Sequence, residues 1–334
     1  MKSSARILAT FLAAALTAAA GSPPMDFYAA VAMTKAQKNS STPTDSGLYR
    51  READGRWVHF GPRILGIGSV AAQPGHPAIM LIASADGVVR STDAGRTWRK
   101  TTGWEVLDVR SIAFDPLNPL QVYAATQWGP IRSDDAGANW TPAHAGLAKL
   151  YSQTVIADRT RTGRVLIGTE DGIYESADAA RTWTRVATSP ATTVLRLAQS
   201  GVNGKLLLAG TQHRGAWLSR DGGLTWQQTD PASATANLYA AALNPHDAAV
   251  MAVGGWNAGV RVSNDGGATW TDRTAGLPVK HVFVLAFDPV TPGRLWASTF
   301  EEGTFYSDDL GRTWLEGGLY GAYGFDFIFI PAPN

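Results

Sequence analysis

Short hydrophobic runs, each followed by turn-forming residues, recur along almost the whole chain. Residues 109–114 and 282–287 are two such runs that end at an Asp-Pro pair, and a second run follows each within about seven residues, at 122–126 and 295–299. The runs are rich in β-branched and aromatic residues and are bounded by Gly or Pro, which is typical of strands. The pattern therefore predicts an all-β chain built from short strands.

A motif of the form Ser-x-Asp-x-Gly-x-Thr-Trp recurs between these runs and sets the period of the chain. Ala180 replaces the glycine in the third copy, and Asn139 replaces the threonine in the second. A degenerate copy at 47–57 ends in Trp57, so the seven motif tryptophans are 41 to 44 residues apart. A fixed period of this length indicates a repeat fold. The six regular copies occupy residues 91–98, 133–140, 176–183, 219–226, 263–270 and 307–314.

Each repeat holds enough strands for one blade of a propeller. Two runs, one strand directly before the motif and one after its tryptophan make four strands. The motif then forms the hairpin turn between the third and fourth strands: its Asp accepts backbone N–H groups, its Gly takes a positive φ, and its Trp packs between neighbouring sheets. Regular recurrence favours this structural role over metal binding or acid–base chemistry for Asp93, Asp135, Asp178, Asp221, Asp265 and Asp309.

The two ends of the chain complete one blade. Residues 325–331 align with 109–116 as a first strand without the rest of its blade, whereas 26–31 and 47–57 look like second, third and fourth strands without a first. Pairing the two ends removes the exposed sheet edge of an open ring. We therefore predict an all-β, seven-bladed β-propeller with four-stranded antiparallel blades, closed by the C-terminal innermost strand pairing with the N-terminal strands.

The N-terminus predicts export. Lys2 and Arg6 precede an apolar run at 7–20 that ends in small residues, which is the three-part form of a secretory signal. We expect a signal peptide at residues 1–20, cleaved after Ala20, and a single propeller domain at 21–334 that is periplasmic or secreted. The apolar run is shorter than the roughly 20 residues of a spanning helix, so no stable membrane insertion is expected after cleavage.

Charge and composition exclude several kinds of partner. With 29 basic and 28 acidic residues the net charge is +1, so no global field would hold nucleic acid or an anionic bilayer. The chain has no cysteine, which excludes disulfides, thiolate catalysis and thiolate metal sites. Its six histidines have no recurring spacing with carboxylates, so we expect neither a metal nor a cofactor. We expect a monomer that recognises its partner locally.

From Leu48 to the C-terminus the repeats resemble the Asp-box, or BNR, propellers. That superfamily includes sialidases, xyloglucan-active endoglucanases, sortilin-type receptors and photosystem II assembly factors. The succession Ala-Phe-Asp-Pro, Tyr-Ala-Ala-Thr and Asp box is more similar to its seven-bladed members than to the six-bladed sialidases. The resemblance implies the fold, and activity has to be argued from a site.

Sialidases bind a sialate carboxylate with three arginines and carry an early Phe/Tyr-Arg-Ile-Pro segment, whereas this chain has only Gly-Pro-Arg-Ile at 61–64. One register position of the innermost strands holds mostly small residues and a single arginine. Its two charged members, Arg196 and Asp326, are expected to pair across the channel, and a structural ion pair is favoured over a catalytic duty. The full set at this position is Ser69, Ser111, Thr154, Arg196, Ala240, Val284 and Asp326.

Ligand contacts are expected on the face opposite the Asp boxes, which carries the loops into the first strands and the loops between second and third strands. Aromatic rings there suit sugar or peptide contact, and polar groups add hydrogen bonds. The alternative for each ring is that it caps the end of a blade. The predicted ligand-binding residues are Trp104, Trp128, Tyr151, Arg196, His213, Arg214, Tyr239, Trp256, His281, Tyr323 and Asp326.

Four carboxyl groups on the same face are candidates for catalysis. A glycosidase needs two carboxyls about 5 to 10 Å apart. Glu105 with Asp108, or Glu170 with Glu301 across the axis, could meet that distance.

The sequence favours an exported, non-catalytic binding or assembly propeller that recognises a glycan or an extracytoplasmic protein or peptide on its aromatic loop face. The rival hypothesis is a glycoside hydrolase, sialidase-like or endoglucanase-like, which would require two facing carboxyls in a deep central cleft. A receptor-type module that holds an extended peptide in the channel is the third hypothesis.

Overall fold

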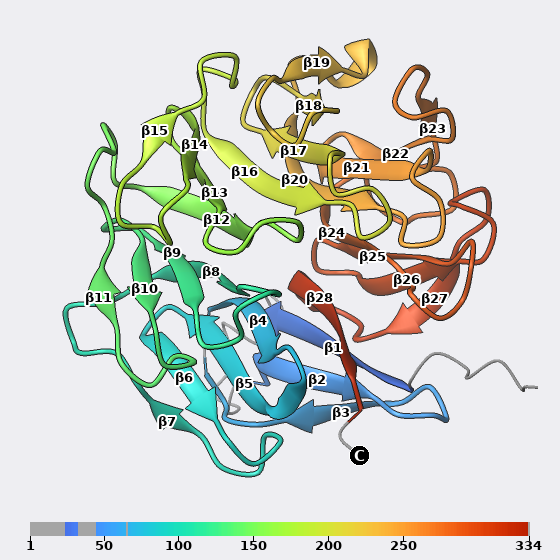
Figure 1. Ribbon diagram of the computed structural model, residues 1–334. Helices are drawn as coiled ribbons and strands as arrows, with labels where there is room; N and C mark the ends of the chain where they lie inside the picture. Colours follow the sequence, from blue (N-terminus) through green and yellow to red (C-terminus); the bar gives the residue numbers. More distant parts are fainter. Residues whose placement is uncertain (1–23, 33–44, 65, 333–334) are drawn as a thin grey trace, which may run out of the picture.

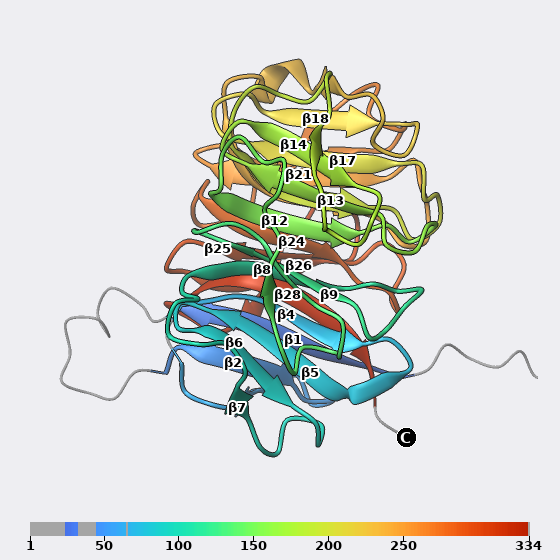
Figure 2. The same cartoon turned by 60° about the vertical axis from the view of Figure 1, so that its left-hand side comes forward.

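A computed structural model describes residues 24–32, 45–64 and 66–332, and these residues form seven antiparallel sheets of four strands each. Figure 1 shows the sheets arranged as blades around a central axis, and Figure 2 shows the same ring from a second direction. The seven-bladed propeller predicted from the repeat is therefore confirmed. The expected signal peptide lies outside the described residues.

Each blade is an antiparallel meander. Its first strand lies at the axis, where the first strands of neighbouring blades contact one another around the ring. The first strands are β28 (Tyr323–Pro331), β4 (Ile67–Gln73), β8 (Val109–Phe114), β12 (Ser152–Ala157), β16 (Val194–Gln199), β20 (Asn237–Leu243) and β24 (Val282–Phe287). The second strands are β1 (Met25–Ala32), β5 (His76–Ser84), β9 (Val122–Thr126), β13 (Val165–Thr169), β17 (Leu207–Thr211), β21 (Met251–Trp256) and β25 (Leu295–Thr299).

The outer half of each blade carries the Asp-box turn. The third strands are β2 (Gly47–Arg51), β6 (Gly87–Ser91), β10 (Ile131–Ser133), β14 (Gly172–Ser176), β18 (Ala216–Ser219), β22 (Gly259–Ser263) and β26 (Gly303–Ser307). The fourth strands are β3 (Trp57–Phe60), β7 (Arg99–Lys100), β11 (Thr141–Pro142), β15 (Thr184–Arg185), β19 (Gln227–Thr229), β23 (Thr271–Asp272) and β27 (Leu315–Gly318). A 3-10 helix, η1, spans Pro231–Ser233. No helix among the described residues has the length and apolar character needed to cross a bilayer.

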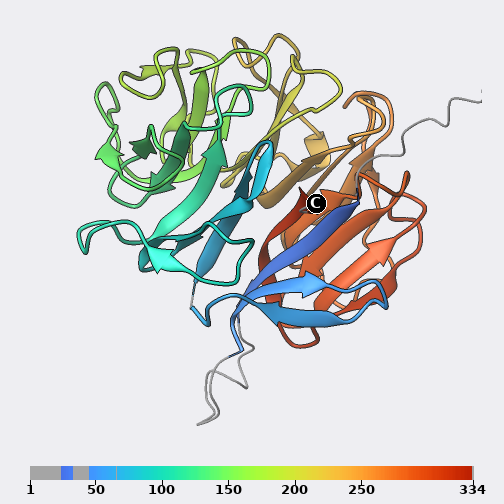
Figure 3. The same ribbon diagram turned by 60° about the horizontal axis from the view of Figure 1, so that its bottom comes forward.

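The ring closes as the sequence predicts. Strand β28 pairs antiparallel with β1, from Met25 opposite Pro331 to Ala32 opposite Tyr323, and the sheet order is β28-β1-β2-β3. Figure 3 shows the red C-terminal strand alongside the blue N-terminal strand. The two ends of the chain thus share one sheet. In every blade of the described residues the first strand is paired with the second.

The same hydrogen bonds hold each Asp-box turn. In the first turn Ser91 Oγ accepts from the Gly95 N–H at 2.9 Å, while Asp93 accepts from the Thr97 N–H at 2.8 Å and from the Thr97 hydroxyl at 2.6 Å. The Thr97 hydroxyl and N–H together lower the pKa of Asp93 to about 2. Both carboxylate oxygens of Asp93 therefore accept hydrogen bonds within the turn, which is the structural role that the recurrence predicts.

In these turns two consecutive residues have positive φ, whereas the motif predicts it only for the glycine. Not only Gly95 (φ 81°) but also the preceding Ala94 (φ 57°) is left-handed, and the third turn places Ala180 itself at φ 62°. The turn geometry tolerates alanine at both positions, because the Ser and Asp hydrogen bonds over-determine the backbone.

Most of the motif tryptophans connect the blades. The Trp140 indole N–H donates to Thr101 Oγ1 of the preceding blade at 3.0 Å, and Trp57 donates to the Gly317 carbonyl across the ring closure at 2.7 Å. Trp183, Trp270 and Trp314 make equivalent bonds to the blade before them. The indoles of Trp98 and Trp226 instead donate to the Gly95 and Gly223 carbonyls of their own turns. Five of the seven motif tryptophans therefore connect their blade to the preceding one by an indole hydrogen bond.

Candidate functional site

Every innermost strand carries a β-bulge at the same position, close to its start. The pairing of first and second strands skips one residue in each of the seven blades. A bulge leaves its extra residue out of the ladder and re-aims that side chain. The bulged residues, which we call the mouth ring, are Gly68, Arg110, Gln153, Leu195, Tyr239, Phe283 and Phe325.

All seven mouth-ring residues line one cavity of about 340 Å³ at the end of the channel opposite the Asp boxes. Going around the axis, Tyr239, Phe283 and Phe325 come from three consecutive blades and form an aromatic arc. Arg110 and Gln153 form a polar arc across from it, with Gly68 and Leu195 between the arcs. The repeat thus places one side chain per blade at the mouth, and those side chains differ from blade to blade.

The aromatic arc belongs to a larger set of rings in contact. The Phe283 ring lies 5.1 Å from Tyr239, nearly parallel, and 5.5 Å from Tyr323. Trp256 stacks on His281 at 4.0 Å and keeps 43% of its surface exposed. The set, which we call the aromatic cluster, is Tyr239, Trp256, His281, Phe283, Phe300, Tyr323 and Phe325.

The polar arc is a short network around the Arg110 side chain, which is 40% exposed although its Nε is buried from solvent. Arg110 Nη2 lies 2.7 Å from Asp108 Oδ2, and its guanidinium stands 5.7 Å from the centre of the Tyr151 ring. The Tyr151 hydroxyl accepts a hydrogen bond from Gln153 at 2.8 Å. Among the described residues Arg110 Nε finds no hydrogen-bond partner. This side of the mouth therefore offers hydrogen-bond donors rather than free carboxylates.

The register position one residue further along fastens the inner strands to one another. Asp326 accepts from the Val70 N–H of the next blade, as Ser111 does from Val155 and Thr154 from Leu197, each at 3.2 Å. The second Asp326 oxygen binds Arg196 at 2.7 Å, which is the expected ion pair across the channel. Because both oxygens of Asp326 are engaged, the pair braces the channel below the mouth.

The candidate carboxyls are not gathered in the mouth cavity. Asp108 lines it but is held by Arg110. The Glu105 carboxylate lies against Gly103 of its own turn, and neither Glu170 nor Glu301 is among the lining residues. Neither candidate pair is therefore brought together in this cavity.

The predicted ligand-binding residues divide into three groups. Arg196 and Tyr239 line the cavity, and Trp256, His281 and Tyr323 join them through the aromatic cluster. Tyr151 and Asp326 do not line the cavity but hold residues that do, Tyr151 through Gln153 and Asp326 through Arg196. Trp104, Trp128, His213 and Arg214 stand outside the cavity on exposed turns, with Trp104 85% and Trp128 63% exposed.

The sequence did not single out seven residues of this site: Gly68, Arg110, Gln153, Leu195, Phe283, Phe300 and Phe325. All but Phe300 occupy the bulge position, one residue before the aligned register position. Reading that preceding position across the repeats would have found the aromatic and polar arcs. The described residues contain no group of three or more His, Asp or Glu side chains placed to hold a metal ion.

The chain is thus a seven-bladed β-propeller in which the residue that each blade places at the mouth of the channel varies around the ring. No protein-family model and no curated protein matches the chain. Among solved structures, the GH74 enzyme of Niastella koreensis aligns with a TM-score of 0.72 at 18% identity, over 86% of this chain and 52% of the enzyme.

Two further similar structures belong to another kind of protein. YCF48 bound to D1 peptide aligns with a TM-score of 0.59 at 17% identity, over 76% of this chain and 83% of that one. YCF48 from Cyanidioschyzon merolae gives 0.58 at 16% identity, over 75% and 84%. This chain therefore spans about half the length of the GH74 enzyme and most of YCF48. At such identities the similarity shows the fold, which is shared by an enzyme and by a peptide-bound protein.

Proposed function

We propose that this chain is an exported, non-catalytic binding propeller whose mouth ring takes an extended peptide segment of a partner protein. The observation that carries the proposal is the division of the mouth ring into an aromatic arc and a polar arc across one cavity. Aromatic rings bury apolar side chains of a peptide, while guanidinium and amide donors bind its backbone carbonyls. A peptide lying across the mouth would use both.

The state of the carboxyls supports binding rather than hydrolysis. A glycosidase requires two carboxyl groups flanking the scissile bond, one as acid and one as base or nucleophile. Asp108 is the one carboxyl that lines the described cavity, and its ion pair with Arg110 keeps it occupied. A structure of similar fold bound to a peptide gives a precedent for this use of the architecture.

A screen against peptide and glycan arrays, recording binding and turnover together, tests the proposal. We expect peptide binding that weakens at least tenfold in Arg110→Gln and in Tyr239→Ala, since anchors of this kind dominate interfaces. Leu224→Ala is the matched control, because Leu224 is exposed on an Asp-box turn at the opposite face. Peptide binding that all three variants retain would place the site elsewhere.

A glycoside hydrolase is the second candidate, favoured by Trp104 and Trp128, whose exposed rings suit stacking on sugars. It predicts release of sugar from a polysaccharide such as xyloglucan, lost in Asp108→Asn. That result would overturn the binding proposal. The location in the periplasm or outside the cell is part of the proposal and rests on the N-terminal sequence.

A further inference from the structure

A second and larger cavity opens at the other end of the channel. Its volume is about 990 Å³, and its walls come from the ends of β4, β8, β12, β16 and β28 on the Asp-box side. The two cavities share no residue: Arg196 lines the mouth cavity, and its ion-pair partner Asp326 lines neither. A ligand at this end would therefore be separate from one at the mouth.

The wall of this cavity is apolar. Ala72, Ala113, Ile156, Ala198 and Ile328 are apolar lining residues that keep partial exposure. Val70, Ile112, Leu197 and Ile330 also line the cavity but are 5% exposed or less, because their side chains pack into the core. A cavity of several hundred Å³ lined mainly by hydrophobic groups is the usual form of a small-molecule site. The occupant should thus bring a substantial apolar body.

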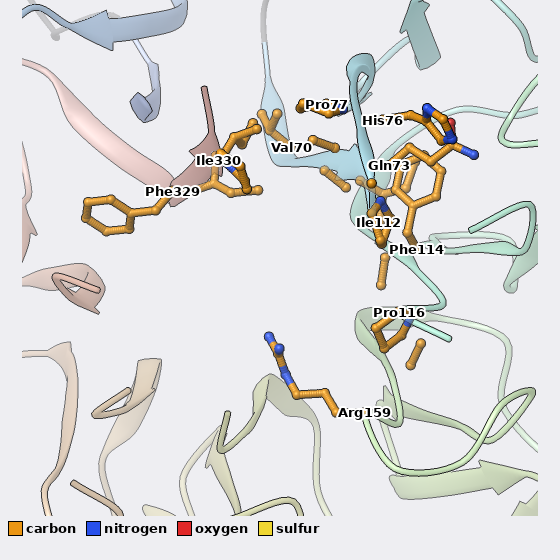
Figure 4. A pocket seen from close by; sticks show the side chains of 18 of the residues that line it. Val70, Gln73, His76, Pro77, Ile112, Phe114, Pro116, Arg159, Phe329 and Ile330 are labelled. Atoms are coloured by element: carbon orange, nitrogen blue, oxygen red, sulfur yellow. The ribbon is translucent and has the colours of Figure 1, made fainter. Parts of the chain in front are cut away.

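The few polar groups lie at the edge, and their charge is one-sided. Arg159 and His76 are the basic residues of the lining, and no Asp or Glu is present among the described residues that line it. Figure 4 shows Arg159 reaching into the cavity, across from Val70 and Ile330. No ion pair of Arg159 occurs among the described residues. Its cation therefore faces an apolar cavity without a carboxylate partner.

Gln73 adds an acceptor at the same edge. Its side chain is 5% exposed, its amide N–H donates to the Pro119 carbonyl at 2.9 Å, and its amide oxygen has no partner among the described residues. Buried acceptors are rarely left unpaired in proteins. Gln73 Oε1 is itself buried from solvent, so it becomes an acceptor for a ligand hydroxyl only if the side chain turns toward the cavity.

From this arrangement we infer that the cavity at the Asp-box end binds a single-chain anionic amphiphile, such as a fatty acid. The acyl tail lies against the partly exposed alanine and isoleucine side chains, and the head group lies at the edge beside Arg159. Charge complementarity decides the sign of the head group, because the lining is basic and lacks carboxylates. The apolar volume decides that the ligand is an amphiphile and not a free anion.

Titration calorimetry of the full chain with octanoate, decanoate and dodecanoate below their micelle concentrations tests the inference. Affinity should rise about tenfold for each two methylene groups, because each buried methylene strengthens binding by a roughly constant increment. Dodecanoate should bind more tightly than dodecanol, and dodecyltrimethylammonium should bind weakest. Equal binding of the three head groups, or no dependence on chain length, would overturn the inference.

Variants test separately the contacts of the ligand's head group and of its acyl tail. Arg159→Gln should weaken dodecanoate binding three- to tenfold and leave dodecanol unchanged, since an exposed ion pair contributes modestly. Arg161→Gln is the matched control, because Arg161 is exposed in the same turn but does not line the cavity. Ala198→Phe should fill the cavity and abolish binding of both ligands, with Ala198→Leu as a milder form if the larger side chain prevents folding. Tyr239→Ala at the mouth should leave the binding of both dodecanoate and dodecanol unchanged, because Tyr239 does not line this cavity.

Two other occupants are distinguishable. The Ala332 N–H donates to the Pro24 carbonyl, and Ala332 lines the cavity, so Pro24 lies beside it. Dodecanoate binding by residues 24–334 but not by the full chain would assign the cavity to residues 1–23 and overturn the inference. A dimer that Ala198→Phe dissociates, without dodecanoate binding, would assign it to a second copy.

Discussion

The Asp-box turns and the mouth ring both occur once per blade, yet they differ in what is repeated. The turns keep the same residues in the same hydrogen bonds, as in Ser91 with Asp93 and Ser263 with Asp265. The mouth ring keeps the same backbone bulge but changes the residue, from Gly68 to Arg110 to Phe325. Repetition of side chains marks what the fold needs, and a repeated backbone position with varied side chains marks where a ligand can be recognised.

The largest expected effect is on the conserved part of a turn. A Cβ at Gly95 would lie 2.1 Å from Cζ of Phe60 in the neighbouring blade, and φ there is 81°. Gly95→Ala should lower the free energy of unfolding by about 3 kcal/mol, through overpacking and left-handed strain. Gly266→Ala is the control, because φ is similar but no atom lies within 4 Å; it should cost about 1 kcal/mol. Urea unfolding measures both, and equal losses would contradict the role of the inter-blade contact.

The brace below the mouth comes next. Asp326→Ala removes the acceptor of the Val70 N–H and leaves Arg196 unpaired, and should cost about 2 kcal/mol, since Arg196 keeps some access to solvent. Asp326→Asn keeps an acceptor for Val70 and should cost about 1 kcal/mol. Thermal unfolding of the two variants separates the ion pair from the backbone bond. If neither variant is less stable than the parent chain, this register position does not fasten the blades.

Acid should weaken the Asp-box turns. The pKa values of Asp93 and Asp265 are lowered to about 2 by the hydroxyl and N–H groups of Thr97 and Thr269, against about 3.9 in an unfolded chain. Between those values the unfolded chain binds more protons. The stabilisation is therefore complete above about pH 5 and is lost as pH falls from 4 toward 2. Urea midpoints across this range measure the decline, which a flat profile would contradict.

The smallest effect on stability is expected at the mouth. Arg110→Gln leaves a polar side chain in a partly exposed position, and its ion pair with Asp108 contributes little in solvent. Its free energy of unfolding should stay within about 0.5 kcal/mol of the parent chain, as for most surface substitutions. A loss as large as that of Asp326→Ala would make Arg110 part of the fold rather than of the site.

This contrast also explains how much the sequence could predict. The propeller, the strand order and the closure by β28 follow from the motif, because every turn needs the same Ser and Asp contacts. The ion pair of Arg196 with Asp326 follows from aligning the innermost strands. These features can be predicted because they recur at a fixed spacing or occupy aligned positions of the repeats.

The mouth could be predicted only in part. Tyr239, Trp256, His281 and Tyr323 stood out as loop aromatics, whereas Phe283 reads as an ordinary strand residue. Only the bulge, a backbone feature without its own residue signature, turns Phe283 toward the channel. The large cavity at the Asp-box end is equally hidden, since the sequence does not show which apolar residues of the inner strands face the channel.

The central claim is that the varied positions of the mouth ring carry recognition while the invariant turns carry stability. The most direct test measures, on one set of proteins, the Kd for a peptide selected from the array and the free energy of unfolding. We predict that Tyr239→Ala weakens peptide binding at least tenfold with little change in stability, and that Gly95→Ala, at the glycine that recurs in the turns, lowers stability with unchanged binding. Loss of binding that merely follows loss of stability across the set would contradict the account.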